Sequence, residues 1–247
     1  MRNTLLPRLM VFCASALVSY ALLPGNVFAE DSDAAHDPTS AYKPQTIEGW
    51  TVLVHERLLS AEPAAAHKAL TLLKHQLYLV QRHVPAGAVT KLQTVKIWVE
   101  EAHPKHPCMC YHPDAGWLRK NAMNPDKAGG VEIANVKNFQ TWTIQQPYMV
   151  LHELAHAYHH QFLPRGYANR EVRDAFERAM EEKSYDKVLR INGRDDRHYA
   201  ATNPMEYFAE ASEAYFGTND FYPYFKSELQ RHDPTMHDLL GKLWQVK

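Results

Sequence analysis

The sequence predicts an α+β fold, with a small sheet in the N-terminal half and helices in the C-terminal half. Three observations predict it. Segments 47–59 and 95–99 alternate in polarity and are rich in β-branched and aromatic residues, as strands are. Residues 144–162 contain an apolar run that is typical of a buried helix. Residues 203–217 begin with Asn-Pro and end with Gly, the pattern of a capped helix.

The same patterns predict the remaining elements. They are a helix at 64–83 opened by Pro63, a short strand at 129–135, an amphipathic helix at 169–183, a hairpin at 188–199 with an Asn-Gly turn, and one or two closing helices at 221–246. We expect the sheet to pack on the helix at 144–162, with the later helices behind it.

The composition indicates a globular enzyme-sized chain rather than a nucleic-acid binder. The chain has 247 residues, of which 45% are hydrophobic, and this suits one domain with an ample core. We place that single domain at 45–247, after a flexible linker at 30–44 that is rich in Asp, Ala, Ser and Pro. The formal net charge of -1 gives no electrostatic case for a nucleic-acid partner or for an anionic membrane.

The N-terminus has the pattern of a signal peptide at 1–29. Two arginines in the first eight residues precede an apolar stretch at 9–23, which is short for a membrane span. Val27-Phe28-Ala29 forms a small-residue cleavage pattern. We therefore expect a secreted or periplasmic protein that leaves the membrane on cleavage, the alternative being an uncleaved anchor.

A His-Glu-x-x-His motif lies inside the apolar helical run. Residues four apart share one helix face, so His152 and His156 can bind one metal ion together. Glu153 follows the first histidine, where its carboxylate can act as a general base on a water at that metal. This pattern is typical of zinc metallopeptidases, so Zn²⁺ is the predicted cofactor.

The spacing leaves the third protein ligand open. Glu206, Glu210 and Glu213 follow one another at i, i+4 and i+7 along one face of the second helix. Any of them can supply the carboxylate that completes a catalytic zinc site. Glu206 also has an alternative role, because it stands at the third helical position after Asn203, where glutamate often bonds back to the cap.

The segments His152-Glu-Leu-Ala-His156 and Glu206-Tyr-Phe-Ala-Glu210 together resemble the catalytic domain of the anthrax lethal factor family of zinc peptidases. The resemblance covers roughly residues 130–217 and implies a zincin-like fold. It implies that Glu206 is the third zinc ligand and that Glu210 holds a ligand histidine in place.

The same resemblance implies a role for a tyrosine. In the lethal factor family, a tyrosine stands seven residues before the ligand glutamate, and here that position is Tyr199. Its phenol would donate a hydrogen bond to the developing oxyanion. The sequence departs from the family after the motif glutamate, where it has Leu-Ala, so the toxin's substrates do not carry over.

These residues predict a monomeric zinc endopeptidase that acts on protein or peptide substrates. Two alternatives share the metal site. One is an inactive zinc-binding secreted module, which would not need Glu153. The other is a zinc amidase that cleaves a cell-wall amide.

A proline-rich segment at 103–113 gathers further possible metal ligands. They are His103, His106, Cys108, Cys110 and His112. We expect an ordered surface loop near the site; a second metal site or a thiol held over the zinc is the alternative. The spacing fits no paired C-x-x-C pattern, and it leaves open whether Cys108 and Cys110 form a bridge or two thiols.

Overall fold

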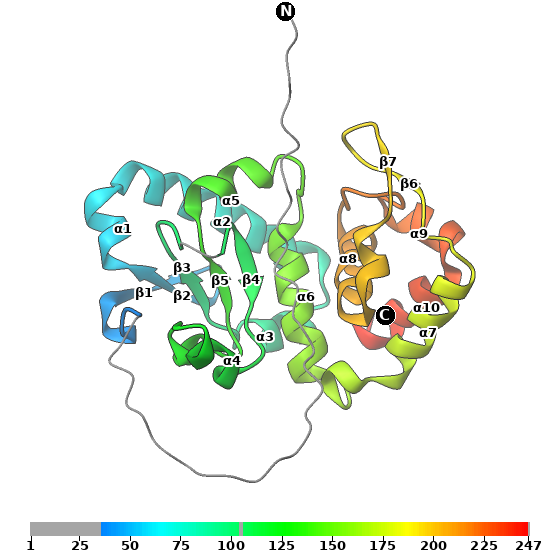
Figure 1. Cartoon of the computed structure of the whole chain (residues 1–247), viewed down its shortest axis with the longest axis horizontal. Helices are drawn as coiled ribbons and strands as arrows, with labels where there is room; N and C mark the ends of the chain where they lie inside the picture. Colours follow the sequence, from blue (N-terminus) through cyan, green and yellow to red (C-terminus); the bar gives the residue numbers. More distant parts are fainter. Residues whose placement is uncertain (1–35, 104–105, 247) are drawn as a thin grey trace, which may run out of the picture.

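The computed structural model describes residues 36–103 and 106–246 (Figure 1). The predicted signal peptide at 1–29 lies outside the described residues. Figure 1 shows the sheet and the first helices on one side, the last helices on the other, and α6 (Met149–Phe162) between them. The predicted α+β architecture, a small sheet packed on the motif helix with further helices C-terminal to it, is confirmed.

The main sheet has five strands in the order β1-β2-β3-β5-β4. Their bounds are β1 Tyr42–Ile47, β2 Trp50–His55, β3 Ile97–Val99, β4 Met109–Tyr111 and β5 Val131–Ile133. β1 and β2 form an antiparallel hairpin, β2, β3 and β5 run parallel, and β4 pairs antiparallel with β5. β4 is therefore an edge strand, and it lies against α6 (Figure 1).

The ordered chain begins earlier than predicted. A 3₁₀ turn at Thr39–Ala41 leads into β1, so the linker predicted at 30–44 overlaps a paired strand. Pro44 within β1 is compatible with pairing because β1 is an edge strand that bonds to one neighbour. The strand predicted at 47–59 is β2 followed by a short helix, α1 (Glu56–Ala61).

Helices surround this sheet and continue the chain. They are α2 Pro63–His83, α3 Ala86–Leu92, α4 Ala115–Lys120, α5 Val136–Trp142, α7 Arg170–Glu181, α8 Pro204–Phe216, α9 Lys226–His232 and α10 Pro234–Leu243. A small hairpin joins β6 (Val188–Leu189) to β7 (Asp195–Asp196). The predicted helices at 64–83, 169–183 and 203–217 are confirmed within one or two residues, whereas α6 begins five residues later than predicted.

The closing helix α10 fixes the far side of the two motif-bearing helices. Trp244, just after α10, stacks on Tyr158 of α6 with ring centroids 4.0 Å apart. Its indole N–H donates to the hydroxyl of Ser212 on α8 over 3.1 Å. Both contacts are fully buried, so the apolar burial of the tryptophan holds α6 and α8 against each other. None of the described helices is long and apolar enough to cross a membrane.

The α6 histidine His159 is buried without polar compensation. Its ring packs against Tyr167 and Phe208, at centroid distances of 5.1 and 4.9 Å. Neither ring nitrogen has a hydrogen-bond partner among the described residues. Burial, reinforced by the nearby His156 and His160, lowers the pKa of His159 to about 3.

His159 should therefore make the fold sensitive to acid. An unfolded histidine has a pKa of about 6.5, so between about pH 6.5 and 3 the unfolded chain binds the extra proton. Stability then falls as pH falls, by up to about 1.4 kcal/mol per pH unit. We expect His159→Phe to lose less stability than wild type in urea unfolding between about pH 7 and 5. The exposed His67→Gln serves as control; parallel pH dependence in wild type and His159→Phe would contradict the assignment.

Candidate metal centre

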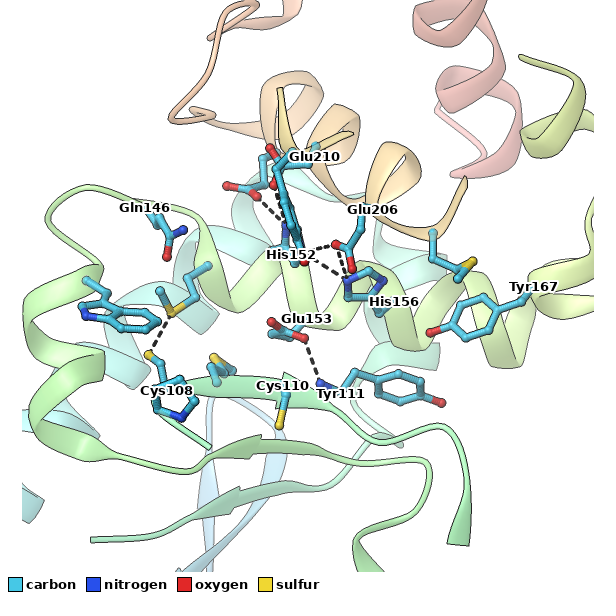
Figure 2. A pocket seen from close by; sticks show the side chains of 17 residues that line it. Cys108, Cys110, Tyr111, Gln146, His152, Glu153, His156, Tyr167, Glu206 and Glu210 are labelled. Carbon is cyan, nitrogen blue, oxygen red and sulfur yellow. Dashed lines mark hydrogen bonds and ion pairs between the residues drawn. The ribbon is translucent and has the colours of Figure 1, made fainter. Parts of the chain in front are cut away.

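Helices α6 and α8 bring three candidate ligand atoms together. Nε2 of His152 lies 3.1 Å from Nε2 of His156 and 3.1 Å from Oε2 of Glu206. The remaining distance, from His156 Nε2 to Glu206 Oε2, is 3.2 Å. All three side chains are buried at the base of a cleft (Figure 2). The structure thus places the three predicted ligands around one point.

This triangle has the size that a metal ion requires. Tetrahedral zinc binds nitrogen and oxygen at about 2.0–2.1 Å, which puts neighbouring ligand atoms about 3.3 Å apart. The observed separations are close to that value. Imidazole nitrogen and carboxylate oxygen are both ligands that zinc binds in proteins. The donor set therefore fits a metal ion.

Helix capping gives Glu206 its direction. Asn203 Oδ1 accepts hydrogen bonds from the backbone N–H groups of Met205 and Glu206, each over 2.9 Å, and so caps α8. The Glu206 carboxylate faces His152 and His156. Burial alone would raise its pKa, but the charge of His156 and hydrogen bonds from both histidines outweigh this and hold the pKa below its usual range.

The second nitrogen of His152 faces a different carboxylate from the one predicted. Its Nδ1 lies 2.7 Å from Oε1 of Glu213 and 3.5 Å from Oε1 of Glu210. The carboxylate that hydrogen-bonds to Nδ1 and orients the ring is therefore that of Glu213. Glu210, which the sequence resemblance assigned to that role, instead accepts from the side-chain amide of Asn219 over 2.9 Å.

Several carboxylates are buried next to the histidines. Burial raises the pKa of Glu210 well above its usual range, and the neighbouring charge of Glu213 adds to this. Burial also raises the pKa of Glu213, although its hydrogen bond to His152 opposes the shift. For His152, burial alone would lower the pKa, but hydrogen bonds to Glu206 and Glu213 outweigh it and raise the pKa. A dication at the triangle would offset this concentration of negative charge.

The predicted base, Glu153, is held by the sheet edge. The backbone N–H of Tyr111 on β4 donates to Glu153 Oε2 over 2.8 Å (Figure 2). Glu153 is partly exposed and lines the same cleft as the three ligands. The segment expected to be a surface loop at 103–113 thus contains a buried strand that contacts the site. The short strand predicted at 129–135 is β5, which lies inside the sheet.

Tyrosines line the cleft beside the metal ligands, and of these only Tyr199 was predicted. Tyr199, at the start of a 3₁₀ turn (Tyr199–Thr202), has its ring centroid 6.4 Å from that of His152. Burial and the charge of Glu206 raise its pKa, so the phenol keeps its proton. Tyr167, in the turn after α6, also lines the cleft beyond His156 (Figure 2). No sequence pattern marks Tyr167, because only the path of the chain after α6 brings it there.

The cleft occupies about 870 Å³, including its opening to solvent. Trp142, Gln146 and Met149 line one end of it, together with Cys108. Cys108 and Cys110 are both buried thiols and are not joined by a disulfide bridge.

Similarity to known proteins is found only among solved structures. Neither a family model nor a curated protein matches the chain. Among solved structures, the PRO-PRO endopeptidase (PPEP-2) from Paenibacillus alvei matches with a TM-score of 0.41 and 19% sequence identity. That match covers 72% of this chain and 90% of the other. No comparison links the chain to the lethal factor family, so that resemblance stays a prediction, and the geometry of the site has to carry the functional argument.

Single substitutions of Glu213 and Glu210 should separate the roles of these two carboxylates of α8. We expect Glu213→Gln to weaken metal binding by about 10–100-fold, because His152 loses the charged partner that orients it. Glu210→Gln, of equal size and on the same helix, should have a much smaller effect. Competition with a chelator measures both affinities, and equal losses would contradict the assignment to Glu213.

Proposed function

We propose that this protein is a zinc-dependent metallopeptidase that hydrolyses peptide bonds in protein or peptide substrates. One observation carries the proposal. Three buried ligand atoms lie within 3.2 Å of one another. Glu153, on the same helix as the two ligand histidines, lies in the same cleft, and the sheet edge holds its carboxylate. A purely structural metal site does not need a positioned carboxylate next to its ligands.

His152, His156 and Glu206 would hold the ion. Zinc bound there supplies Lewis acidity, acidifying a water and polarising the scissile carbonyl. Glu213 keeps the proton on Nδ1 of His152, so that Nε2 presents its lone pair to the ligand triangle.

Glu153 is suited to move the proton. Its Oε2 accepts a hydrogen bond from the Tyr111 N–H, which holds the carboxylate in the cleft, where it can accept a proton from the attacking water. The carboxyl group can then deliver the proton to the leaving amine. The hydrogen bond from a rigid strand holds the carboxylate in one orientation between these steps.

Tyr199 is suited to stabilise the oxyanion. Its raised pKa keeps the phenol protonated at neutral pH, so it can donate a hydrogen bond. Tyr199 lies in the turn that packs against α8, and both Tyr199 and the residues of β4 line the cleft.

The outer edge of β4 supports a peptide as the substrate, with Met109 as the pairing residue, because the Tyr111 N–H is already bonded to Glu153. Backbone groups alternate between the two sides of an antiparallel strand, so Met109 N–H and C=O face the same side as the Tyr111 N–H. An extended peptide can pair with this side and present its backbone carbonyl to the site. Because backbone pairing is independent of side chains, it favours peptides over other amides such as cell-wall crosslinks. We also propose that the protein acts after export, on the basis of the pattern at 1–29.

Removal of the base should separate binding from catalysis. We expect Glu153→Gln to retain its zinc and to lose peptide cleavage by about 10²–10⁴-fold. The assay combines metal analysis with cleavage of a peptide library, and the exposed Glu177→Gln is the matched control.

Two outcomes would replace the proposal. Zinc in both proteins with no peptide cleavage in either would favour a zinc-binding module, or an amidase if cell-wall fragments are cleaved instead. A wild-type protein that binds no zinc would remove the basis of the proposal.

The two phenols give a second test of the mechanism. We expect Tyr199→Phe to lower kcat by about 10²–10³-fold with little change in KM, because its hydrogen bond forms in the transition state. The control is Tyr167→Phe, which removes the phenol of another tyrosine of the cleft and should retain most of the activity. The reverse ranking would assign the oxyanion role to Tyr167.

A further inference from the structure

A second group of potential ligands lies on the opposite face of β4. Cys110 stands directly across from Glu132 of β5 in the strand register, so their side chains share one face of the sheet. His112 follows two residues after Cys110 and returns to that face. All three side chains are buried. In Figure 2 the sulfur of Cys110 points away from His152 and Glu153, so this group is separate from the first centre.

The three ligand atoms converge on one point. Nε2 of His112 lies 3.6 Å from Sγ of Cys110 and 2.6 Å from Oε2 of Glu132. All three atoms lie within 4.8 Å of one another. The sulfur–nitrogen separation fits a shared zinc ion, for which bond lengths of about 2.3 and 2.0 Å give roughly 3.5 Å. The carboxylate would have to withdraw from the imidazole by less than about 1 Å.

Nε2 of His112 lies between a sulfur and a carboxylate oxygen, so one metal ion at this position would bind all three groups at once. A further imidazole lies beside the group: the ring centroid of His106 is 6.2 Å from that of His112.

The surrounding charges also favour a cation. The buried Lys127 lies 2.5 Å from Glu132 Oε1 and 2.6 Å from Glu100 Oε1. Two carboxylates and one ammonium leave a net formal charge of about -1 in this region. A zinc ion with a Cys110 thiolate would add about +1 and make the buried group neutral.

We propose that Cys110, His112 and Glu132 form a second zinc site, separate from the group of His152, His156 and Glu206. Thiolate, imidazole and carboxylate are all ligands of zinc, whereas the carboxylate disfavours softer ions such as Cu(I). The site would tie β4 to β5. Tyr111, the residue between Cys110 and His112, holds Glu153, so the second ion would also stiffen the support of the first centre.

Metal content of the full chain tests this proposal. Purified under mild reductant, wild type should hold about two zinc ions per chain. Cys110→Ser should hold about one, and the double variant His152→Ala/His156→Ala should also hold about one. The matched control is Cys108→Ser, which removes the other buried thiol and should keep about two.

Cobalt substitution gives an independent readout, which can already be made on the wild-type protein. The cleft ligands include no thiolate, so a thiolate-to-cobalt charge-transfer band would come from Cys110. The band should appear in wild type, remain in Cys108→Ser and disappear in Cys110→Ser. A wild type with about one zinc per chain and no charge-transfer band would overturn the second site while leaving the first intact.

Discussion

The imidazole of His152 is the contact on which the arrangement of the site depends. Its two nitrogens point in opposite directions, one toward Glu206 and His156 and the other toward Glu213. One ring therefore fixes both the position of α8 along α6 and the rotation of α8 about its own axis. The helices also approach closely at their ends, since a Cβ added to Gly217 would lie 2.1 Å from the ring of Tyr148. Only glycine fits there, so this close approach is encoded in the residue that ends α8.

Helix geometry then divides the chemistry between two neighbours of α6. Successive residues on a helix are rotated by about 100°, so His152 faces α8 while Glu153 faces β4. The metal ligands thus depend on the packing of two helices, and the base depends on the edge of the sheet. β4 itself has two sides with different roles. The Tyr111 N–H meets the base, whereas the side chains of Cys110 and His112 face Glu132.

Much of this could be predicted from local sequence, and the failures have clear causes. The α+β class, α2, α8 and the motif helix follow from periodicity, capping residues and one motif. β4 could not be predicted, because three residues among prolines become a strand only through pairing with β5. The choice between Glu210 and Glu213 was equally hidden. Both lie on one stripe of α8, and the crossing of α6 and α8 decides which carboxylate reaches His152.

The buried carboxylates of α8 need different forms of compensation, and this links the fold to the metal. Asp220, which follows α8 in the chain, is paired with Arg190, whose guanidinium donates to it over 2.8 Å. Burial raises the pKa of Glu210 well above its usual range, so Glu210 can avoid its charge by taking up a proton. Glu206 stays ionised, because its pKa is held below the usual range. Its carboxylate faces the Nε2 atoms of His152 and His156. A cation bound at that point would stabilise the charge further, so metal binding would stabilise the packing of α8 on α6 as well as create the reactive centre.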